Sequence, residues 1–341
     1  MSNKVINIAP LVIVRSLVYN HEPYLRQCLD GFVMQKTTFK FEVQVHDDAS
    51  TDKSADIILE YANKYPNLIK PFIEEENQYS KGNAGKWKWG ELNCKYIALC
   101  EGDDYWTDPY KLQKQVDYLE SHLDCTMACS RTKLYSERDK RFIGENYCYR
   151  HNAVVKAKDV INRSGLFIST CSIVYRKSLL EDYPSYCYNC VVGDYPLQIM
   201  AAMKGYIYYF NDIMSVYRIN NSNSWMSNQS WSSVTDSNLK RISSMINMFD
   251  GFSQTYLKHR LTFKNKIASY LISQCPSKSD NEGREYYLYK QHFSSYYDAF
   301  PVFWKLVDIL KSVDVPKVRG AISLSLSYLF KCYSDQRLMY K

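Results

Sequence analysis

Two short acidic stretches carry the side chains of this sequence that are best suited to chemistry. The first begins with the pair Asp47 and Asp48 and ends at Asp52, and the second has the sequence Glu-Gly-Asp-Asp at residues 101–104. Hard divalent cations such as Mg²⁺ and Mn²⁺ prefer carboxylate oxygens, and a turn that contains Gly lets neighbouring carboxylates converge. Three acidic residues in four positions, directly after an apolar run, therefore predict a metal or substrate site at residues 101–104.

The first acidic stretch suits a different ligand. A carboxylate at the end of a strand can accept hydrogen bonds from a nucleobase or a ribose hydroxyl, which makes Asp47 and Asp48 candidate binding residues. Asp52 precedes a helical pattern and is more simply interpreted as a helix N-cap. Asp194 stands directly before a helix start that contains Pro, and the residues alone favour the same N-cap interpretation for it.

The elements that position these residues alternate along the chain. Continuous apolar runs predict buried strands, and apolar residues at helical spacing predict helices at 22–34 and 53–64 between them; the strands are predicted at 11–17, 41–46, 68–73 and 96–100. Such alternation is typical of an α/β layer with a largely parallel sheet. Ligands of these sheets bind beyond the carboxyl ends of the strands, so we expect both acidic stretches at one edge.

The second half of the chain changes character. Residues 168–175 and 206–210 are predicted as strands and 197–204 as a helix, and from about residue 237 onward successive amphipathic helices are predicted. We therefore predict an α/β catalytic domain at 1–235 and a helical region at 236–341. Its helices are predicted at 256–272, 285–300 and 302–313, with a further apolar stretch at 324–330.

Composition narrows the class of protein. Of 341 residues, 46% are apolar and 23% charged, which is typical of a globular chain with material for a core. The net charge of +7 permits an acidic membrane surface or a phosphorylated substrate, but the cations are spread along the chain, so nucleic acid is not an expected partner.

The 11 cysteines predict neither zinc nor disulfides. Only Cys187 and Cys190 form a Cys-x-x-Cys pair, and no second pair lies at zinc-site spacing. An odd count without a secretory signal predicts a reducing cytoplasm. No run approaches the roughly 18–20 apolar residues of a membrane span. We expect a cytoplasmic chain that is soluble or peripheral on the inner face of the plasma membrane.

Taken together, the motifs resemble the family 2 glycosyltransferases, an inverting family with the GT-A fold. The resemblance covers residues 9 to 225 and is carried by Val-Tyr-Asn at 18–20, by Asp-Asp-Ala-Ser-Thr-Asp at 47–52, and by residues 101–104 in the place of an Asp-x-Asp metal motif. It implies a Rossmann-like, mixed and mostly parallel sheet flanked by helices.

The resemblance also implies roles for individual residues. Asp48, with Asp47, would contact the base and ribose of a nucleotide, next to Tyr19. Asp103 and Asp104 would hold Mn²⁺ or Mg²⁺ on the diphosphate. Glu101 would lie near the ribose or a water on the metal. Asp194 matches the catalytic carboxylate, which removes a proton from the acceptor hydroxyl during an inverting displacement.

Two positions depart from the family pattern. Glu101 replaces the more usual Asp, and Asn220 and Asn221 lie where many relatives carry His. Arg218 is a candidate partner for a phosphate, with a structural salt bridge as an equal alternative. Candidate platforms for stacking on sugar rings are Trp106, Tyr195 and Trp225.

The sequence therefore predicts inverting transfer of a sugar from a nucleoside-diphosphate donor, with UDP expected, to a sugar or lipid-linked acceptor in surface polysaccharide assembly. A non-catalytic nucleotide-sugar-binding module is the main alternative. A nucleotidyltransferase would need a Gly-rich phosphate loop after the first strand, and a hydrolase would need a residue that activates water. The C-terminal helices have three candidate roles: packing on the catalytic domain, homo-oligomerisation, and contact with a membrane surface.

Overall fold

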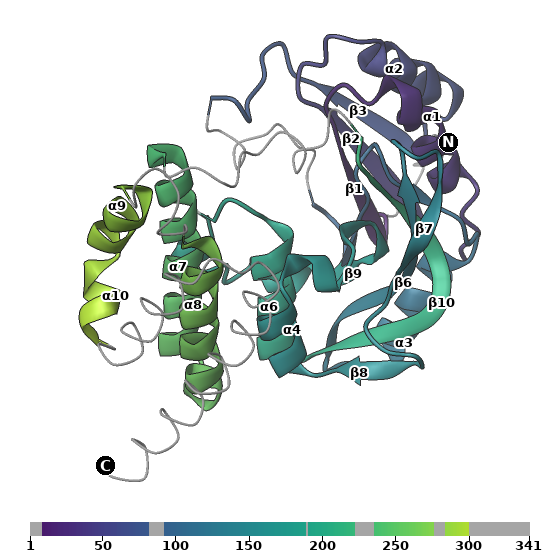
Figure 1. The fold of residues 1–341 in the computed structure, drawn as a ribbon. Coiled ribbons are helices and arrows are strands. Elements are labelled where there is room, and N and C mark those ends of the chain that lie inside the picture. The colour runs from purple at the N-terminus through teal and green to yellow at the C-terminus, as the bar shows by residue number, and fades with distance from the viewer. Residues whose placement is uncertain (1–8, 82–91, 189, 222–234, 276–283, 300–341) are drawn as a thin grey trace. The chain divides into compact units, whose positions relative to one another are not determined.

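The computed structural model describes residues 9–81, 92–188, 190–221, 235–275 and 284–299 (Figure 1). The chain forms two compact units. An α/β unit comprises residues 1–183 and 194–228, and a helical unit comprises residues 184–193 and 229–341. The helical unit therefore includes a short segment that interrupts the α/β unit in sequence.

The α/β unit is built on one mixed sheet. Its strands lie in the order β3-β2-β1-β4-β9-β6-β10-β5, with β7 paired to β6 and β8 paired to β10. The strands are β1 (Val12–Val18), β2 (Phe41–Asp47), β3 (Ile69–Ile73), β4 (Tyr96–Leu99), β5 (Tyr105–Trp106), β6 (Cys125–Ser136), β7 (Arg141–Asn146), β8 (Ala153–Val155), β9 (Val174–Arg176) and β10 (Tyr206–Ile219). β1 to β4 are mutually parallel, as are β6 and β10, while β5, β7, β8 and β9 pair antiparallel. The predicted mixed, mostly parallel sheet is confirmed.

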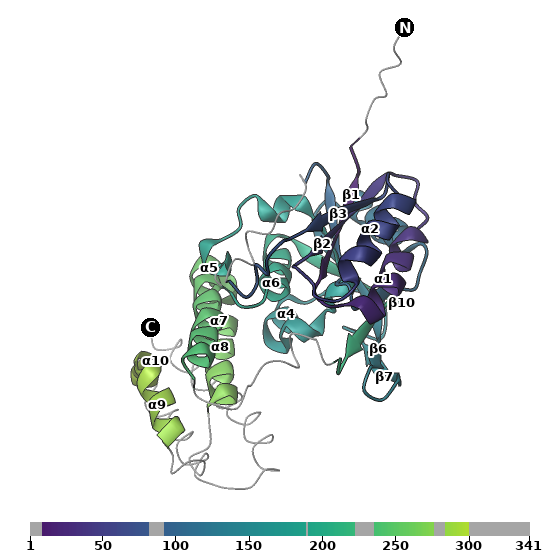
Figure 2. The same ribbon diagram turned by 90° about the horizontal axis from the view of Figure 1, so that it is seen from above.

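Helices cover both faces of this sheet. In Figure 2, α1 and α2 lie on one side of β1 to β3, and α4 and α6 lie on the other. The helices of this unit are α1 (Glu22–Val33), α2 (Ser54–Lys64), α3 (Lys111–Ser121), α4 (Ala157–Arg163) and α6 (Asp194–Lys204). The buried face of α1 carries Leu25, Cys28, Leu29 and Phe32 at helical spacing. These side chains pack in one core with Val12 and Val14 of β1, which explains why alternate positions of β1 are apolar.

The predicted edge for the acidic stretches is confirmed by the strand register. Val18, the last residue of β1, pairs with Asp47, the last residue of β2, and β4 runs parallel beside β1. The backbone N–H of Gly102, just after β4, donates to the carbonyl of Leu17 at 2.8 Å. Both acidic stretches therefore leave the sheet at the same edge, on either side of β1.

The predicted strand at residues 168–175 is mostly wrong. Thr170–Ser172 forms a 3₁₀ turn, and only Val174–Arg176 is strand. The hydroxyl of Ser172 donates to the carbonyl of Ser169 at 2.7 Å, so a local side-chain bond competes with strand pairing at this point.

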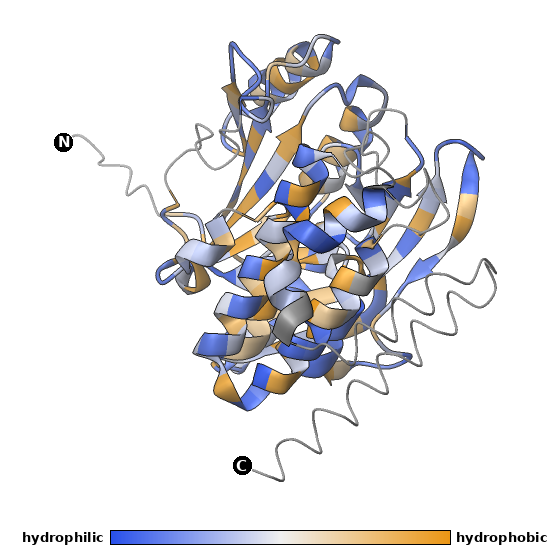
Figure 3. Cartoon of the chain, turned by 60° about the vertical axis from the view of Figure 1, so that its left-hand side comes forward, coloured by the Kyte–Doolittle hydropathy of each residue, from blue (hydrophilic) through white to orange (hydrophobic). Residues whose placement is uncertain are grey.

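The described part of the helical unit contains α5 (Ser185–Tyr188), α7 (Asp236–Thr255), α8 (Arg260–Gln274), α9 (Arg284–His292) and α10 (Ser294–Ala299). Thr235 caps α7 by accepting a hydrogen bond from the N–H of Asn238. The helices carry both hydrophobic and hydrophilic positions (Figure 3), in keeping with the predicted amphipathic pattern. The helix predicted at 285–300 is divided into α9 and α10. The stretches predicted at 302–313 and 324–330 lie outside the described residues.

Among the described residues, no helix is both long and apolar enough to cross a membrane. The ten cysteines in this part of the chain are all free thiols.

Candidate functional site

The loops after β1 and β2 are joined by side-chain hydrogen bonds. Asn20 accepts from the N–H of Thr51 at 2.7 Å, and its own N–H donates to the hydroxyl of Ser50 at 2.8 Å. Asp52 accepts from the N–H groups of Ser54 and Glu22, both at 2.9 Å. Asp52 thus binds the first N–H group of α2 and of α1, from the position before Lys53, which is the N-cap residue of α2.

Asp47 and Asp48 are both buried at this edge, and the carboxylate of each accepts hydrogen bonds from backbone N–H groups. Asp47 accepts from the N–H and hydroxyl of Ser50, at 2.9 and 2.5 Å, and so shapes its own turn. Asp48 accepts from the N–H groups of Gln78 and Tyr79, at 2.7 and 3.1 Å, and so fixes the loop that follows β3. Tyr19 lies beside them and is 42% exposed, which leaves its ring accessible to a ligand.

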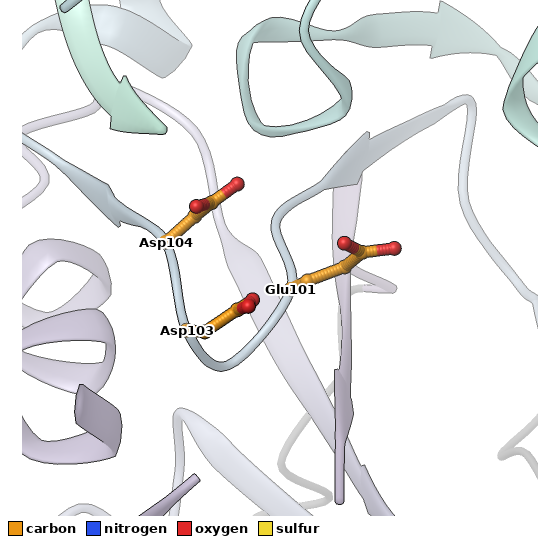
Figure 4. Close-up of side chains that lie close together, drawn as sticks. All are labelled: Glu101, Asp103 and Asp104. Carbon is orange, nitrogen blue, oxygen red and sulfur yellow. The ribbon is translucent and has the colours of Figure 1, made fainter. Parts of the chain in front are cut away.

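The second acidic stretch forms a tight turn between β4 and β5. The N–H of Asp104 donates to the carbonyl of Glu101 at 3.0 Å, and the three acidic side chains leave this one turn (Figure 4). One oxygen from each of Glu101, Asp103 and Asp104 lies within 4.8 Å of the others. Gly102 is required here, because a Cβ at this position would meet His21 Nδ1 and Val18 Cγ2 at 2.8 Å.

Burial and the charge of Asp103 disfavour the charged forms of Glu101 and Asp104. Burial, followed by the charges of Asp103 and Asp194, raises the pKa of Glu101 to about 8. Burial, followed by the charge of Asp103, raises the pKa of Asp104 well above its usual range. A cation bound at the turn would offset this cost and favour the ionised forms of Glu101 and Asp104.

The oxygen atoms of the turn fit a hard divalent cation. Asp104 is 1% exposed, and its Oδ1 accepts from the N–H of Arg218 at 2.8 Å. Its Oδ2 is buried and accepts no hydrogen bond of ordinary geometry, and the nearby thiol of Cys171 opposes the rise in the pKa of this carboxyl only in part. An unsatisfied buried carboxylate oxygen beside two further carboxylates is the donor set that Mg²⁺ and Mn²⁺ prefer.

Asp194, at the first position of α6, belongs to the same region. Its Oδ2 accepts from the hydroxyl of Thr170 at 3.1 Å, and its Oδ1 accepts from the N–H of Tyr195 at 2.8 Å. Burial raises its pKa, which these hydrogen bonds partly oppose. Because the charge of Asp194 also raises the pKa of Glu101, the two carboxyls are electrostatically coupled. A carboxylate with a raised pKa is suited to accept a proton near neutral pH.

Arg218 lies against the acidic turn, but its guanidinium is occupied by the protein. Its side chain has Glu137, Gln27 and the carbonyl of Asp103 as partners. This arrangement favours the structural alternative over direct contact with a phosphate.

Two of the three predicted stacking platforms are wrong. Trp106 is 2% exposed, packs edge-on against Phe32 and donates from Nε1 to the carbonyl of Cys171 at 2.8 Å. Tyr195 is equally buried, and its hydroxyl donates to the carbonyl of Ile161. Both rings fill the core and cannot reach a sugar. Trp225 lies outside the described residues.

Three residues at the site carry no signal in the sequence: Gln27 and Glu137 contact Arg218, and Thr170 contacts Asp194. Asn221, which lies where many relatives carry His, donates to Asp103 Oδ2 at 2.9 Å. Each lies far along the chain from its partner, so no spacing rule connects them.

The raised pKa of Glu101 predicts that the metal-free protein loses stability as pH rises. The folded protein keeps the Glu101 proton up to about pH 8, whereas the unfolded chain releases it near the ordinary value of 4.5. The folded state therefore binds more protons in between, and the free energy of unfolding should fall by roughly 2–4 kcal/mol from pH 5 to 8. Urea unfolding in EDTA, followed by tryptophan fluorescence, measures this. In the Glu101→Gln variant, the free energy of unfolding should depend less on pH. An equal dependence on pH in both proteins would contradict the raised pKa of Glu101.

Part of the chain is similar to proteins of a known family. Residues 16–184 match the family model described as Glycosyl transferase family 2. An uncharacterised protein of Mycobacterium tuberculosis is 38% identical over 216 residues, which cover 62% of this chain and 60% of that protein. An uncharacterised glycosyltransferase of Nostoc sp. is 24% identical over 229 residues, covering 61% and 65% of the two chains. The match thus spans less than two thirds of these relatives' own length.

Two solved structures are similar to this chain at lower identity. Residues 1–349 of S. aureus TarS in complex with UDP-GlcNAc are 17% identical, with a TM-score of 0.49 and coverage of 84% of this chain and 92% of that one. A mannosyltransferase from Pyrobaculum calidifontis, in complex with GDP-Man and Mn²⁺, is 13% identical, with a TM-score of 0.49 and coverage of 98% and 89%.

Proposed function

The chain belongs to the family 2 glycosyltransferases, with the GT-A fold of that family, and we propose that it transfers a sugar from a nucleoside diphosphate to an acceptor hydroxyl with inversion. The observation that carries this proposal is the convergence of three carboxylates at the sheet edge, with Asp194 coupled to them. That edge is where ligands of α/β sheets bind.

The nucleotide lies, in this proposal, over the loops after β1 and β2. The exposed ring of Tyr19 would stack on the base, and the buried carboxylates of Asp47 and Asp48 would accept hydrogen bonds from the nucleoside. Because the carboxylate of Asp48 holds two backbone N–H groups of the loop after β3, it shapes the base pocket as well as contacting the ligand. UDP is the expected nucleotide.

A divalent cation, Mn²⁺ or Mg²⁺, would be held by Asp103 and Asp104, and when bound it supplies positive charge that stabilises the departing diphosphate. Glu101 reaches toward the same space, with a side chain one methylene longer than the usual Asp. Asn221 orients Asp103 by donating to its Oδ2, so that the other carboxylate oxygen stays available.

Asp194 is proposed as the catalytic base. Its carboxylate takes the proton from the acceptor hydroxyl while that oxygen bonds to the anomeric carbon. The bond from the anomeric carbon to the diphosphate breaks in the same displacement, and the nucleoside diphosphate leaves with the electron pair. Thr170 fixes the orientation of Asp194 by donating to its Oδ2.

The proposal also covers the two units of the chain, the acceptor and the place of the reaction in the cell. The α/β unit is the catalytic domain, and the helical unit serves packing, homo-oligomerisation or membrane-surface contact. A sugar or lipid-linked saccharide is the acceptor, in assembly of a surface polysaccharide at the inner face of the plasma membrane. A non-catalytic nucleotide-sugar-binding module is the alternative, and it would bind donor without turnover.

Calorimetric titration with UDP, with and without Mn²⁺, tests the proposal. We expect UDP to bind in the presence of Mn²⁺ and to lose most of its affinity in EDTA, because the cation neutralises the acidic turn and the diphosphate together. Titration with GDP is the control for the base. Binding of GDP alone would overturn the uridine assignment, and metal-independent binding would overturn the proposed role of the turn.

A further inference from the structure

We propose that Arg218 is a positioning residue, which holds the backbone of the acidic turn while its ion pair with Glu137 keeps its charge away from the three carboxylates. This inference rests on the proposed function, because it assigns the acidic turn to a divalent cation. It replaces the phosphate contact first considered for Arg218.

The hydrogen bonds of Arg218 are directed to the backbone of the turn and to its support. Its own N–H donates to Asp104 Oδ1 at 2.8 Å, and its Nη1 donates to the carbonyl of Asp103. Nη2 donates to Oε1 of Gln27, on α1. Because β10 pairs with β5 through Ser215 and Val216, the end of β10 lies alongside the strand that leaves the turn. Arg218 thus ties the turn to both α1 and β10.

The charge of the guanidinium is balanced by a different acid. Nε of Arg218 lies 2.8 Å from Glu137 Oε1, and the two side chains are 6% and 9% exposed. The rings of Tyr24 and Tyr105 lie 5.1 and 4.6 Å from the guanidinium carbon and cover it. The contacts of the guanidinium in the described part of the chain therefore involve one carboxylate, Glu137, which is not part of the turn.

The pairing of Arg218 with Glu137, rather than with the carboxylates of the turn, affects metal binding. A buried arginine without its partner carries an uncompensated charge, which costs several kcal/mol and favours any carboxylate within reach. Here those carboxylates would be the proposed metal ligands, and an arginine bound to them would compete with the cation. Glu137 prevents this competition. Its N–H also donates to the carbonyl of Ile219 at 2.9 Å, so the β6–β7 hairpin is fixed at the end of β10.

The Glu137→Gln variant tests the inference. We expect its affinity for Mn²⁺ in the presence of UDP to fall by about tenfold, as when a group that orients a metal ligand is removed. Loss of the free-Mn²⁺ signal in electron paramagnetic resonance measures binding without reference to activity. In a transfer assay, the Mn²⁺ concentration for half-maximal rate should rise more than kcat falls. Glu145→Gln is the matched control, because Glu145 pairs with Arg131 in the same hairpin.

The outcomes separate this inference from the proposed function. If the wild-type protein binds Mn²⁺ with neither UDP nor GDP, the proposed function fails. If wild type and Glu137→Gln bind Mn²⁺ equally, the positioning role of Arg218 fails and the proposed function stands. Should Glu137→Gln unfold, Arg218→Lys provides the second test, since Lys keeps the charge but lacks the forked donors. Unchanged Mn²⁺ affinity in a folded Arg218→Lys protein would equally overturn the inference.

Discussion

Replacing Asp194 by Asn should lower kcat by about 10³-fold, within the range that general-base catalysis contributes. An amide keeps the shape of the carboxyl and can still accept the hydrogen bond from Thr170, which Asp194 Oδ2 receives at 3.1 Å. It cannot take a proton from the acceptor hydroxyl. Nucleotide binding with Mn²⁺ should therefore stay close to that of the wild-type protein, while turnover is lost.

The measurement is the rate of sugar release or transfer from the donor, with UDP titration as the check on binding. Asp117→Asn is a suitable control, because this exposed residue of α3 accepts a bond from Gln113 and lies outside the proposed site. A decrease of less than tenfold in Asp194→Asn would remove this residue as the base. Wild-type UDP binding without turnover of any donor would favour the non-catalytic binding module.

The second large effect is expected from Asp103→Ala, which should weaken Mn²⁺-dependent binding of UDP by about 100-fold, or about 2.7 kcal/mol. The variant removes one of three carboxylates that lie within 4.8 Å of one another. It also leaves Asn221 Nδ2 without the carboxylate oxygen to which it donates at 2.9 Å. Binding of UDP measured in EDTA should change little, because in the proposed function the residue acts through the cation.

Calorimetry of UDP binding gives the affinity for UDP with Mn²⁺ and the affinity without it for the same protein. Asp212→Ala removes an exposed carboxylate of β10 and serves as the control for loss of one negative charge. If Asp103→Ala retains wild-type affinity in Mn²⁺, the cation is held elsewhere. If it loses affinity equally in EDTA, Asp103 contacts the nucleotide directly.

Together, these variants divide the site into a donor side and an acceptor side. In the proposed function, Asp103 and Asp104 act on the diphosphate and Asp194 acts on the acceptor, and the charges of Asp103 and Asp194 both act on Glu101. Asp103→Ala should therefore change donor binding, and Asp194→Asn should change turnover. A variant that altered both to the same extent would indicate a loss of structure at the sheet edge.

The local pattern of residues was enough to predict the α/β class and the edge where the acidic stretches lie. Strand and helix signals depend on apolar periodicity within one element, and carboxyl ends of parallel strands share an edge whatever the loops do. The hydrogen bond of Asp52 to the start of α2 is local in the same way. These properties are encoded within a few residues, so they can be read without the tertiary structure.

Only the tertiary structure decided which distant side chains meet. Glu137 and Arg218 form a buried ion pair across the β6–β10 register, and Trp106 and Tyr195 are buried rather than exposed to a sugar. Residue type does not determine burial, because an aromatic ring with one polar atom fits the core whenever that atom finds a carbonyl. Such contacts depend on how β6, β10 and α6 pack together, and this packing is set by the whole core rather than by any single segment.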